Sequence, residues 1–600
     1  MTMLPQACGN YPSHDETFIK FPSRRSVVHS TKGIVSTTSP LATEAGLQTL
    51  RDGGNAADAA IAAAAVLNVV DPSMTGIGGD VFCLFYEAKT SKVHALNGSG
   101  RSSSNATLDV ICDDLKITDR IFGAIPNTSI HSVTVPGAAA GWLDIIDNFG
   151  SGKTSISHVL QPAIQMAKNG FPVSEISSYY WIRSEQELRN KPNGTDLLKE
   201  DASASGGYRA PQAGEMMKNP LLARTLEALA ERGKSGFYEG SVAESIINIS
   251  QQLGGFLTLA DLKEHTSEVV DPVSLELSLQ PGEPSINLWE HPPNGQGIVA
   301  QMALGILTEL EREGQIPEFC GKDHNSALYL HALIQALRIS FADGTWYVTD
   351  PASTIDPNLL LSQPYLAQRA KLFDPSRSTQ VEKPGVPAEL PKTGDTVYLC
   401  VIDQEGNACS LVNSVADTFG SRIVPPGTGF VLQNRGSGFH LGPPNHPNLY
   451  APRKRPYNTI IPALTTNVSD GSLHSVFGVM GGAMQPQGHV QVLLNMTKFR
   501  MNPQAALDAP RICIGVSLPG KATDPTKKVD LTVYLEEGIS QDVAETLEQM
   551  GHETKFICGM ERSLFGRGQI IRVHEDAAEG TRVYSAGSDM RGDGNAAPLI

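Results

Sequence analysis

The amino-acid sequence predicts a globular protein that combines helices with β-strands. Its 600 residues are 40% hydrophobic and 18% charged, which is typical of a chain with a large buried core. Helix-like and strand-like patterns alternate along the chain. A proline-rich segment separates two stretches of such patterns, and a hairpin pattern follows it directly. The length alone favours more than one folded unit.

Four segments show apolar residues at helical spacing or end at helix-stopping residues. The pattern over residues 55–70 ends at Asp71-Pro72, and residues 324–342 carry a second apolar face. The segments 241–253 and 541–550 are each followed by glycine, which readily adopts the left-handed conformation that ends a helix. We therefore expect helices in all four places.

The segment between Asp374 and Lys392 differs in composition from its surroundings. It carries Pro375, Pro384, Pro387 and Pro391 among polar residues and has no apolar periodicity, so it is predicted to be an exposed linker. A strand pattern from Thr396 to Asp403 follows, then a turn, then a second apolar run over residues 408–412. Thr396 thus begins a strand directly behind a linker.

Charge and hydropathy exclude several classes of partner. A formal charge of −16 argues against nucleic acid or an anionic membrane surface, because both require basic patches. The first thirty residues lack the pattern of a signal peptide. The longest apolar stretch, residues 56–70, contains Asp58 and is too short to cross a bilayer. We therefore expect a cytoplasmic protein with no nucleic-acid or membrane partner.

No metal or cofactor is expected from the motifs. The eight cysteines form no metal-type C-x-x-C pair and are expected to be reduced core residues. The glycine cluster at 76–79 lacks the spacing of a dinucleotide-binding fingerprint. Motifs typical of zinc metalloproteases, α/β-hydrolases and P-loop proteins are also missing from the sequence.

Two local features are compatible with amide chemistry. A threonine hydroxyl becomes a useful nucleophile when its own free α-amine accepts the proton, which requires a cut just before Thr396. The glycines Gly481 and Gly482 follow an apolar run and would let backbone N–H groups approach a reacting oxygen. Spacing alone favours the ordinary alternatives, a strand-initial threonine and a tight strand-to-helix turn.

Taken in order, a series of segments resembles the γ-glutamyltransferase family of N-terminal-nucleophile hydrolases from about Val35 onward. The matching segments are Asp52–Ala59, Gly76–Asp80, Val135–Gly137 with Gly141, Leu160–Ala163, Gly170–Pro172, Gly236–Gly240, Phe256–Asp261, Asp508–Arg511 and Ser588–Gly594. Their collinearity is far more specific than any one of them. In this resemblance Thr396 occupies the position of the family's autocatalytic nucleophile.

The resemblance implies the fold and the division of the chain. It implies an α+β protein, an αββα four-layer sandwich built from two chains after self-cleavage of the Asp395–Thr396 bond. The expected parts are an N-terminal extension (1–34), a large chain (35–395) that ends in the linker at about 374–395, and a small chain (396–600). The large and small chains would remain partners.

The resemblance also implies the catalytic residues. The Thr396 hydroxyl would first attack the preceding carbonyl and later attack a substrate amide to form an acyl-enzyme. Ser414 stands where the family keeps a supporting hydroxyl, and Gly481 and Gly482 match its oxyanion-binding pair. His331 is expected to be a core or boundary residue. His489 follows the glycine pair and could reach the site, but a mechanism that uses the N-terminal amine does not need it, so both histidines are left out of the catalytic set.

The pocket residues depart from the pattern that binds a γ-glutamyl group. Ala416, Arg435 and Gly438 stand at the positions that contact the α-amino group, so the stretch 432–439 lacks a carboxylate for it. Asn458 and Thr459 replace the serine pair that binds the α-carboxylate. The family's arginine for that carboxylate aligns with Ser99, and Arg101 is a candidate to take over its role.

These departures resemble a divergent branch that includes oxamate amidohydrolases and cephalosporin-acylase-like enzymes, as do the segments Pro293–Gly297 and Met484–His489. Loss of one charge-assisted contact weakens binding of a zwitterionic group by roughly 1.5–3 kcal/mol. Arg435 would favour an anionic substrate without an ammonium. The alternative is that Arg435 pairs with a surface acid.

Three functions remain open from the sequence. The leading one is hydrolysis or acyl transfer of a small carboxylate-bearing amide, with Arg101, Arg435, Asn458 and Thr459 as the expected binding residues. The second is a genuine glutathione hydrolase or γ-glutamyl transferase, acting on glutathione or a conjugate. The third is an inactive scaffold, which the presence of Thr396, Ser414 and the glycine pair disfavours.

Overall fold

The computed structural model describes residues 25–121, 123–278, 284–379, 395–515 and 531–600. Two antiparallel sheets of seven strands form its centre. The first sheet has the order β1 (Val28–Ser30), β20 (Thr581–Ser588), β19 (Gly568–Asp576), β15 (Leu473–Val479), β14 (Ala463–Asn467), β11 (Ile286–Glu290) and β10 (Val273–Leu277). The second has the order β21 (Asn595–Pro598), β2 (Ile34–Thr37), β12 (Asp395–Ile402), β13 (Ala408–Ala416), β3 (Asp80–Glu87), β4 (Lys92–Gly98) and β9 (Glu268–Val270).

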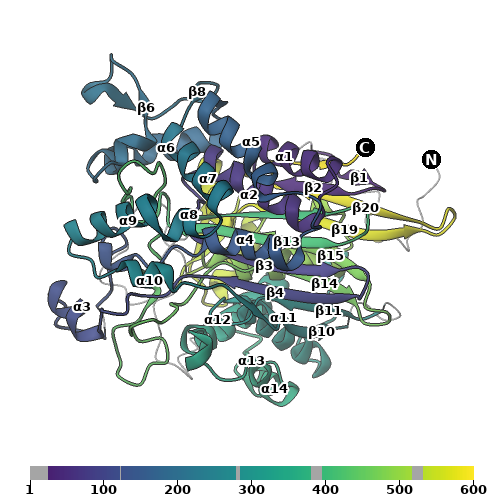
Figure 1. Ribbon diagram of the computed structural model, residues 1–600. Coiled ribbons are helices and arrows are strands. Elements are labelled where there is room, and N and C mark those ends of the chain that lie inside the picture. Colours follow the sequence, from purple (N-terminus) through teal and green to yellow (C-terminus); the bar gives the residue numbers. More distant parts are fainter. Residues whose placement is uncertain (1–24, 122, 279–283, 380–394, 516–530) are drawn as a thin grey trace.

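The two sheets pack face to face, with β12 against β15 and β19. Gly478 on β15 allows this close approach, because a Cβ atom there would lie 2.5 Å from the ring of Tyr398 on β12. Helices cover the outer faces: α1 (Pro40–Arg51), α2 (Ala56–Val70) and α4 (Ala138–Phe149) on the second sheet, and α11 (Gly297–Arg312), α15 (Met484–Thr497) and α16 (Pro503–Asp508) on the first. In Figure 1, α1 and α2 lie in the upper half of the view beside β2, and α11 lies in the lower half beside β10 and β11. The expected αββα four-layer sandwich is confirmed.

Helix α2 shows how composition sets this packing. All of its residues are buried, and most are alanines, so it fits between strands β12 and β13 and helix α5 (Ile156–Asn169). Its N-terminus is capped by Asn55 and Asp58, each of which accepts a hydrogen bond from the backbone of the other. Small side chains let the backbones approach closely while apolar surface is removed from water.

The four helices expected from the sequence are present. They are α2 (Ala56–Val70), α9 (Gly240–Gln252), α12 (Ala327–Tyr347) and α17 (Gln541–Gln549). The expected hairpin is β12 and β13. Strand β1 and the first residue of β2 lie within residues 1–34, which were expected to be an extension, because β1 pairs with β20 at the edge of the first sheet. Most of the expected linker, residues 380–394, lies outside the described residues.

Candidate active site

Thr396 lies at the start of strand β12, next to Ser414 near the end of strand β13. The hydroxyl of Thr396 donates a hydrogen bond to the Ser414 hydroxyl at 3.1 Å, and both side chains are fully buried. The strand register shifts between Asp395 and Val397, so a bulge brings Thr396 opposite Ser414. Ala416 follows with a φ of 80° and donates its N–H to the Ser414 hydroxyl at 2.9 Å.

The glycine pair forms the turn between β15 and α15. Gly481 and Gly482 have φ angles of 124° and 56°, a region that residues with a Cβ rarely adopt. Their carbonyls accept hydrogen bonds from the N–H groups of Met484 and Gln485. In the described part of the chain, the N–H groups of the two glycines have no hydrogen-bond acceptor. This turn therefore presents two donors that can bind a developing negative charge.

Gln485 connects this turn to Thr396. Its amide nitrogen lies 3.5 Å from the Thr396 hydroxyl, and its amide oxygen accepts a hydrogen bond from the N–H of Ile461 at 3.0 Å. The second bond orients the side chain so that the NH₂ group points at the threonine. Gln485 was not among the residues expected at the site, although it lies in the segment 484–489 that carried part of the family resemblance.

Arg435 lies next to the two hydroxyls. Its guanidinium donates to Ser414 at 3.3 Å and to the Thr459 hydroxyl at 2.7 Å, and the side chain is buried. Burial lowers the pKa of the guanidinium, and the carboxylates of Asp80 and Asp417 oppose this shift. Arg435 is therefore not a surface residue paired with a surface acid, the alternative that the sequence left open.

Asp80 is a carboxylate that sequence reasoning missed. It begins β3, where it pairs with Ser414 of β13, and its Oδ2 lies 3.9 Å from the Nε of Arg435. Asp80 also accepts hydrogen bonds from the Gly100 N–H at 2.9 Å and the Asn458 amide at 3.2 Å. Burial raises its pKa to about 6, although Arg435 and these hydrogen bonds favour the charged form.

The structure brings most of the expected residues together. One chain of hydrogen bonds links Thr396, Ser414, Arg435 and Thr459. Asp80 connects Asn458 to this chain, and Gln485 connects the glycine turn to it. This group of residues is called the Thr396 cluster below.

Arg101 and Gly438 lie outside the Thr396 cluster. Arg101 donates to Glu268 at 2.5 Å and lines an open cleft of about 260 Å³. The carbonyl of Gly438 accepts from Asn448. Ser99, which aligns with the family's arginine, is buried and bonded to Asn97.

The two histidines set aside from catalysis have partners elsewhere. His331, in α12, contacts His552 at 2.7 Å and the carbonyl of Asp374 at 2.8 Å. His489, in α15, lies 2.7 Å from Glu290, and both side chains are fully buried. Both histidines are core residues, which confirms the expectation for His331.

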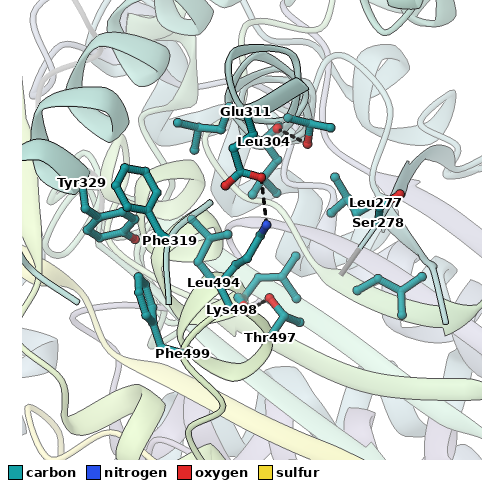
Figure 2. A pocket seen from close by; sticks show the side chains of 14 residues that line it. Leu277, Ser278, Leu304, Glu311, Phe319, Tyr329, Leu494, Thr497, Lys498 and Phe499 are labelled. Carbon is teal, nitrogen blue, oxygen red and sulfur yellow. Dashed lines mark hydrogen bonds and ion pairs between the residues drawn. The ribbon is translucent and has the colours of Figure 1, made fainter. Parts of the chain in front are cut away.

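A separate cavity lies among the outer helices of the first sheet (Figure 2). Leu304, Phe319, Tyr329 and Phe499 line it, and Lys498 forms an ion pair with Glu311 at 2.8 Å beside it. Its volume of about 40 Å³ has room for little more than one water molecule. None of its lining residues belongs to the Thr396 cluster.

The described ranges contain neither a metal-binding cluster nor a membrane-spanning helix. No group of three or more His, Cys, Asp or Glu side chains is placed to hold a metal ion in those ranges. No helix in the same ranges has both the length and the apolar character needed to cross a bilayer.

The four-layer fold, together with the related proteins and solved structures that follow, defines the class of protein as an N-terminal-nucleophile hydrolase. Residues 42–599 match the gamma-glutamyltranspeptidase family. The chain is 34% identical to the glutathione hydrolase-like YwrD proenzyme of Bacillus subtilis (strain 168), over 95% of this chain and 99% of the relative. It is 30% identical to the oxamate amidohydrolase proenzyme of Klebsiella pneumoniae subsp. pneumoniae, over 95% and 98%.

Among solved structures, the cephalosporin acylase from Bacillus halodurans matches over 100% of both chains, with a TM-score of 0.82 and 36% sequence identity. The chain belongs to the gamma-glutamyltranspeptidase family. It is a self-cleaving enzyme that hydrolyses amides or transfers acyl groups. The proenzyme names of the relatives imply processing into a large and a small chain.

Proposed function

We propose that Thr396 is the nucleophile both for cleavage of the Asp395–Thr396 bond and for turnover of an amide substrate. The observation that carries this proposal is the buried Thr396–Ser414 hydrogen bond beside the glycine turn. It combines a hydroxyl at the start of a strand with unpaired backbone donors, the two parts that acyl chemistry needs.

The first reaction is self-cleavage. The Thr396 oxygen attacks the carbonyl carbon of Asp395, and the carbonyl oxygen takes up the negative charge. The C–N bond then breaks, the nitrogen of Thr396 takes a proton, and an ester remains between the Asp395 acyl group and the Thr396 oxygen. Water hydrolyses this ester, which leaves a carboxylate on Asp395 and a free α-amine on Thr396.

Turnover uses the new amine as the base. It accepts the proton of the Thr396 hydroxyl as the oxygen attacks the substrate amide, and the proton then passes to the leaving amine. The acyl-enzyme is resolved by water or by an acceptor amine. The N–H groups of Gly481 and Gly482, together with the Gln485 amide, are the donors that would stabilise the tetrahedral intermediate.

The proposed substrate is a small amide that carries a carboxylate. Arg435 offers two guanidinium nitrogens beside the nucleophile, and Thr459 and Asn458 provide further polar groups. The Arg101 guanidinium is paired with Glu268, so the proposal rests on Arg435. The oxamate amidohydrolase relative is consistent with a substrate of this kind.

A second candidate is favoured by Asp80. Its buried carboxylate could pair with the α-ammonium of a γ-glutamyl group, a contact that Ala416 and Gly438 do not provide. This supports hydrolysis of glutathione or a conjugate, and the Bacillus subtilis relative is named as glutathione hydrolase-like. Against it, Asp80 already accepts from Gly100 and Asn458 and lies near Arg435.

Intact mass and N-terminal sequencing test the nucleophile. We expect the purified protein to give two chains, with Thr396 as the new N-terminus, and Thr396→Ala to stay a single chain of 64.1 kDa. Thr396→Ser is the matched control, since it keeps a hydroxyl and should still cleave. A wild-type protein that remains uncut and inactive after prolonged incubation would refute the assignment.

Substrate choice is tested by measuring the release of two different products by the cleaved enzyme. Ammonia release from oxamate-like amides should exceed glutamate release from glutathione in kcat/KM. The reverse order would favour the glutathione candidate and the Asp80 contact. No release from either class, from a correctly cleaved enzyme, would contradict the carboxylate-bearing substrate.

A further inference from the structure

The side chain of Gln296 joins two parts of the Thr396 cluster. Gln296 is fully buried just before helix α11. Its amide nitrogen donates to the carbonyl of Gly482 at 2.8 Å and to the carbonyl of Thr459 at 2.7 Å. Its amide oxygen accepts from the Tyr457 hydroxyl at 2.7 Å. Two carbonyls and one hydroxyl donor define which end of the amide is nitrogen.

The two carbonyls belong to two different parts of the Thr396 cluster. Gly482 is half of the turn that offers N–H groups to the developing charge. Thr459 receives the hydrogen bond from Arg435, the proposed contact for the substrate carboxylate. One side chain therefore sets how far the charge-stabilising turn lies from the carboxylate-binding group.

The backbone around Gln296 holds it rigidly. Its N–H donates to the carbonyl of Asn458, and the N–H of Asn458 donates back to the carbonyl of Asn294 at 2.9 Å. The Asn294 amide donates to the carbonyl of Pro456 at 2.7 Å. These hydrogen bonds connect the segment Pro293–Gly297, which leads into helix α11, to the loop that carries Thr459.

We propose that Gln296 is a positioning residue for both acyl-transfer reactions, acting through Gly482 and Thr459. This rests on the proposed role of Thr396. Within the described ranges, Gln296 makes no hydrogen bond to Thr396, so its effect comes through the groups that it places. A displacement of about 1 Å at a reacting centre can cost on the order of a hundredfold in rate.

Helix α11 offers a matched control. Gln301 is also fully buried, and its amide nitrogen donates to two carbonyls, those of Val273 at 2.8 Å and Leu288 at 3.1 Å. These carbonyls lie on β10 and β11, away from the Thr396 cluster. Gln296→Met and Gln301→Met therefore remove the same kind of double contact, one at the site and one outside it.

The test compares wild type, Gln296→Met and Gln301→Met in melting temperature, rate of self-cleavage, and kcat and KM per cleaved active site. We expect similar losses of melting temperature in both variants. Gln296→Met alone should lower kcat by about ten- to a hundredfold, slow self-cleavage and raise KM for a carboxylate-bearing amide. Gln301→Met should keep kcat within about twofold of wild type, as expected for a change remote from the site.

Gln296→Glu adds a readout that a purely structural role would not produce. An ionised carboxylate facing two carbonyl oxygens has no hydrogen to donate, whereas the protonated acid has one. Its kcat relative to wild type should therefore rise as the pH falls. If Gln296→Met fails to fold, Tyr457→Phe, which removes only the hydroxyl bonded to the Gln296 amide oxygen, should still lower kcat by several-fold.

Two results would overturn the proposal. One is a kcat for Gln296→Met within twofold of wild type, and the other is an equal loss of kcat in both glutamine variants. The N-terminus of the wild-type small chain tests Thr396 separately, so a failure of the nucleophile assignment is recognised before the variants are compared.

Discussion

Among the described residues, the Thr396 hydroxyl contacts the Ser414 hydroxyl and the Gln485 amide, and no imidazole or carboxylate is one of its hydrogen-bond partners there. In the continuous chain the nitrogen of Thr396 is an amide and cannot accept a proton. The α-amine that we propose as the base would exist only after cleavage. Arg435 reaches the Thr396 hydroxyl through Ser414, to which it donates at 3.3 Å.

Asp80 leads to a prediction about pH. Its pKa of about 6 means that the carboxyl is mostly neutral below pH 6 and charged above it. The charged form competes with an anionic substrate for Arg435, so KM for a carboxylate-bearing amide should rise as the pH increases through 6. Asp80→Asn should remove this step and lower KM at pH 8 by about tenfold or less, as expected for one partly screened charge.

The measurement is KM from pH 5 to pH 8 for wild type and Asp80→Asn. An uncharged amide is the control substrate, because its KM should show no step that depends on Asp80. An unchanged step in Asp80→Asn would assign the titration to another group, for which Asp417, whose pKa burial also raises to about 6, is the nearest candidate.

At the scale of elements, the close approach of β12 and β15 positions Thr396 and the glycine turn relative to each other. Thr396 lies at the start of β12, and the turn follows the end of β15. Gly478 permits the contact because its missing side chain leaves room for the Tyr398 ring. Any side chain at 478 would push the two sheets apart.

Gly478→Ala should destabilise the fold by about 1–3 kcal/mol through this overlap. Tyr398→Leu removes the ring, so the double variant should lose at least about 1 kcal/mol less than the sum of the two single losses. Denaturant unfolding would measure this, with Thr396→Ala as the background so that every protein stays a single chain. Strictly additive losses would show that the two residues do not compete for the same space.

Helix α12 shows where element boundaries depend on tertiary contacts. Its apolar pattern predicts an end near residue 342, but the helix continues to Tyr347. Asp343 is buried there and forms an ion pair with Arg369 at 2.9 Å, and Gly344 packs against Val299. A buried charge and a glycine would normally argue against a helix interior, and only their distant partners make them acceptable.

At the scale of the whole molecule, the two expected chains are interleaved. In the second sheet β12 and β13 of the small chain lie between β2 and β3 of the large chain. In the first sheet β14 of the small chain pairs with β11 of the large chain, and β20 pairs with β1. Cleavage before Thr396 breaks one covalent bond and leaves these ladders and the shared core in place.

We therefore expect the cleaved chains to co-elute in size-exclusion chromatography at every salt concentration up to about 1 M, because buried strand pairs are little screened by salt. A denaturing gel of the same fraction should show two bands, and Thr396→Ala should elute in the same position with one band. Separation of the chains under native conditions would contradict the interleaved arrangement.

The sequence by itself determined the family, the four-layer fold, the strand that begins near Thr396 and the presence of a glycine turn. The strand and the turn are local patterns, whereas the family and the fold follow from the order of many short motifs along the whole chain. It also identified Ser414, Arg435 and Thr459 as neighbours of Thr396, through family positions.

Only the tertiary structure decided the remaining contacts. It placed Asp80 beside Arg435, Gln485 beside Thr396, and Gln296 between the glycine turn and the loop of Thr459. It also paired Arg101, an expected substrate-binding residue, with Glu268. Asp80 is more than 300 residues from Ser414 along the chain, and they meet because β3 pairs with β13. Hydrogen bonds depend on distances of about 3 Å. Strand pairing and sheet stacking set these distances, and a local sequence pattern does not contain them.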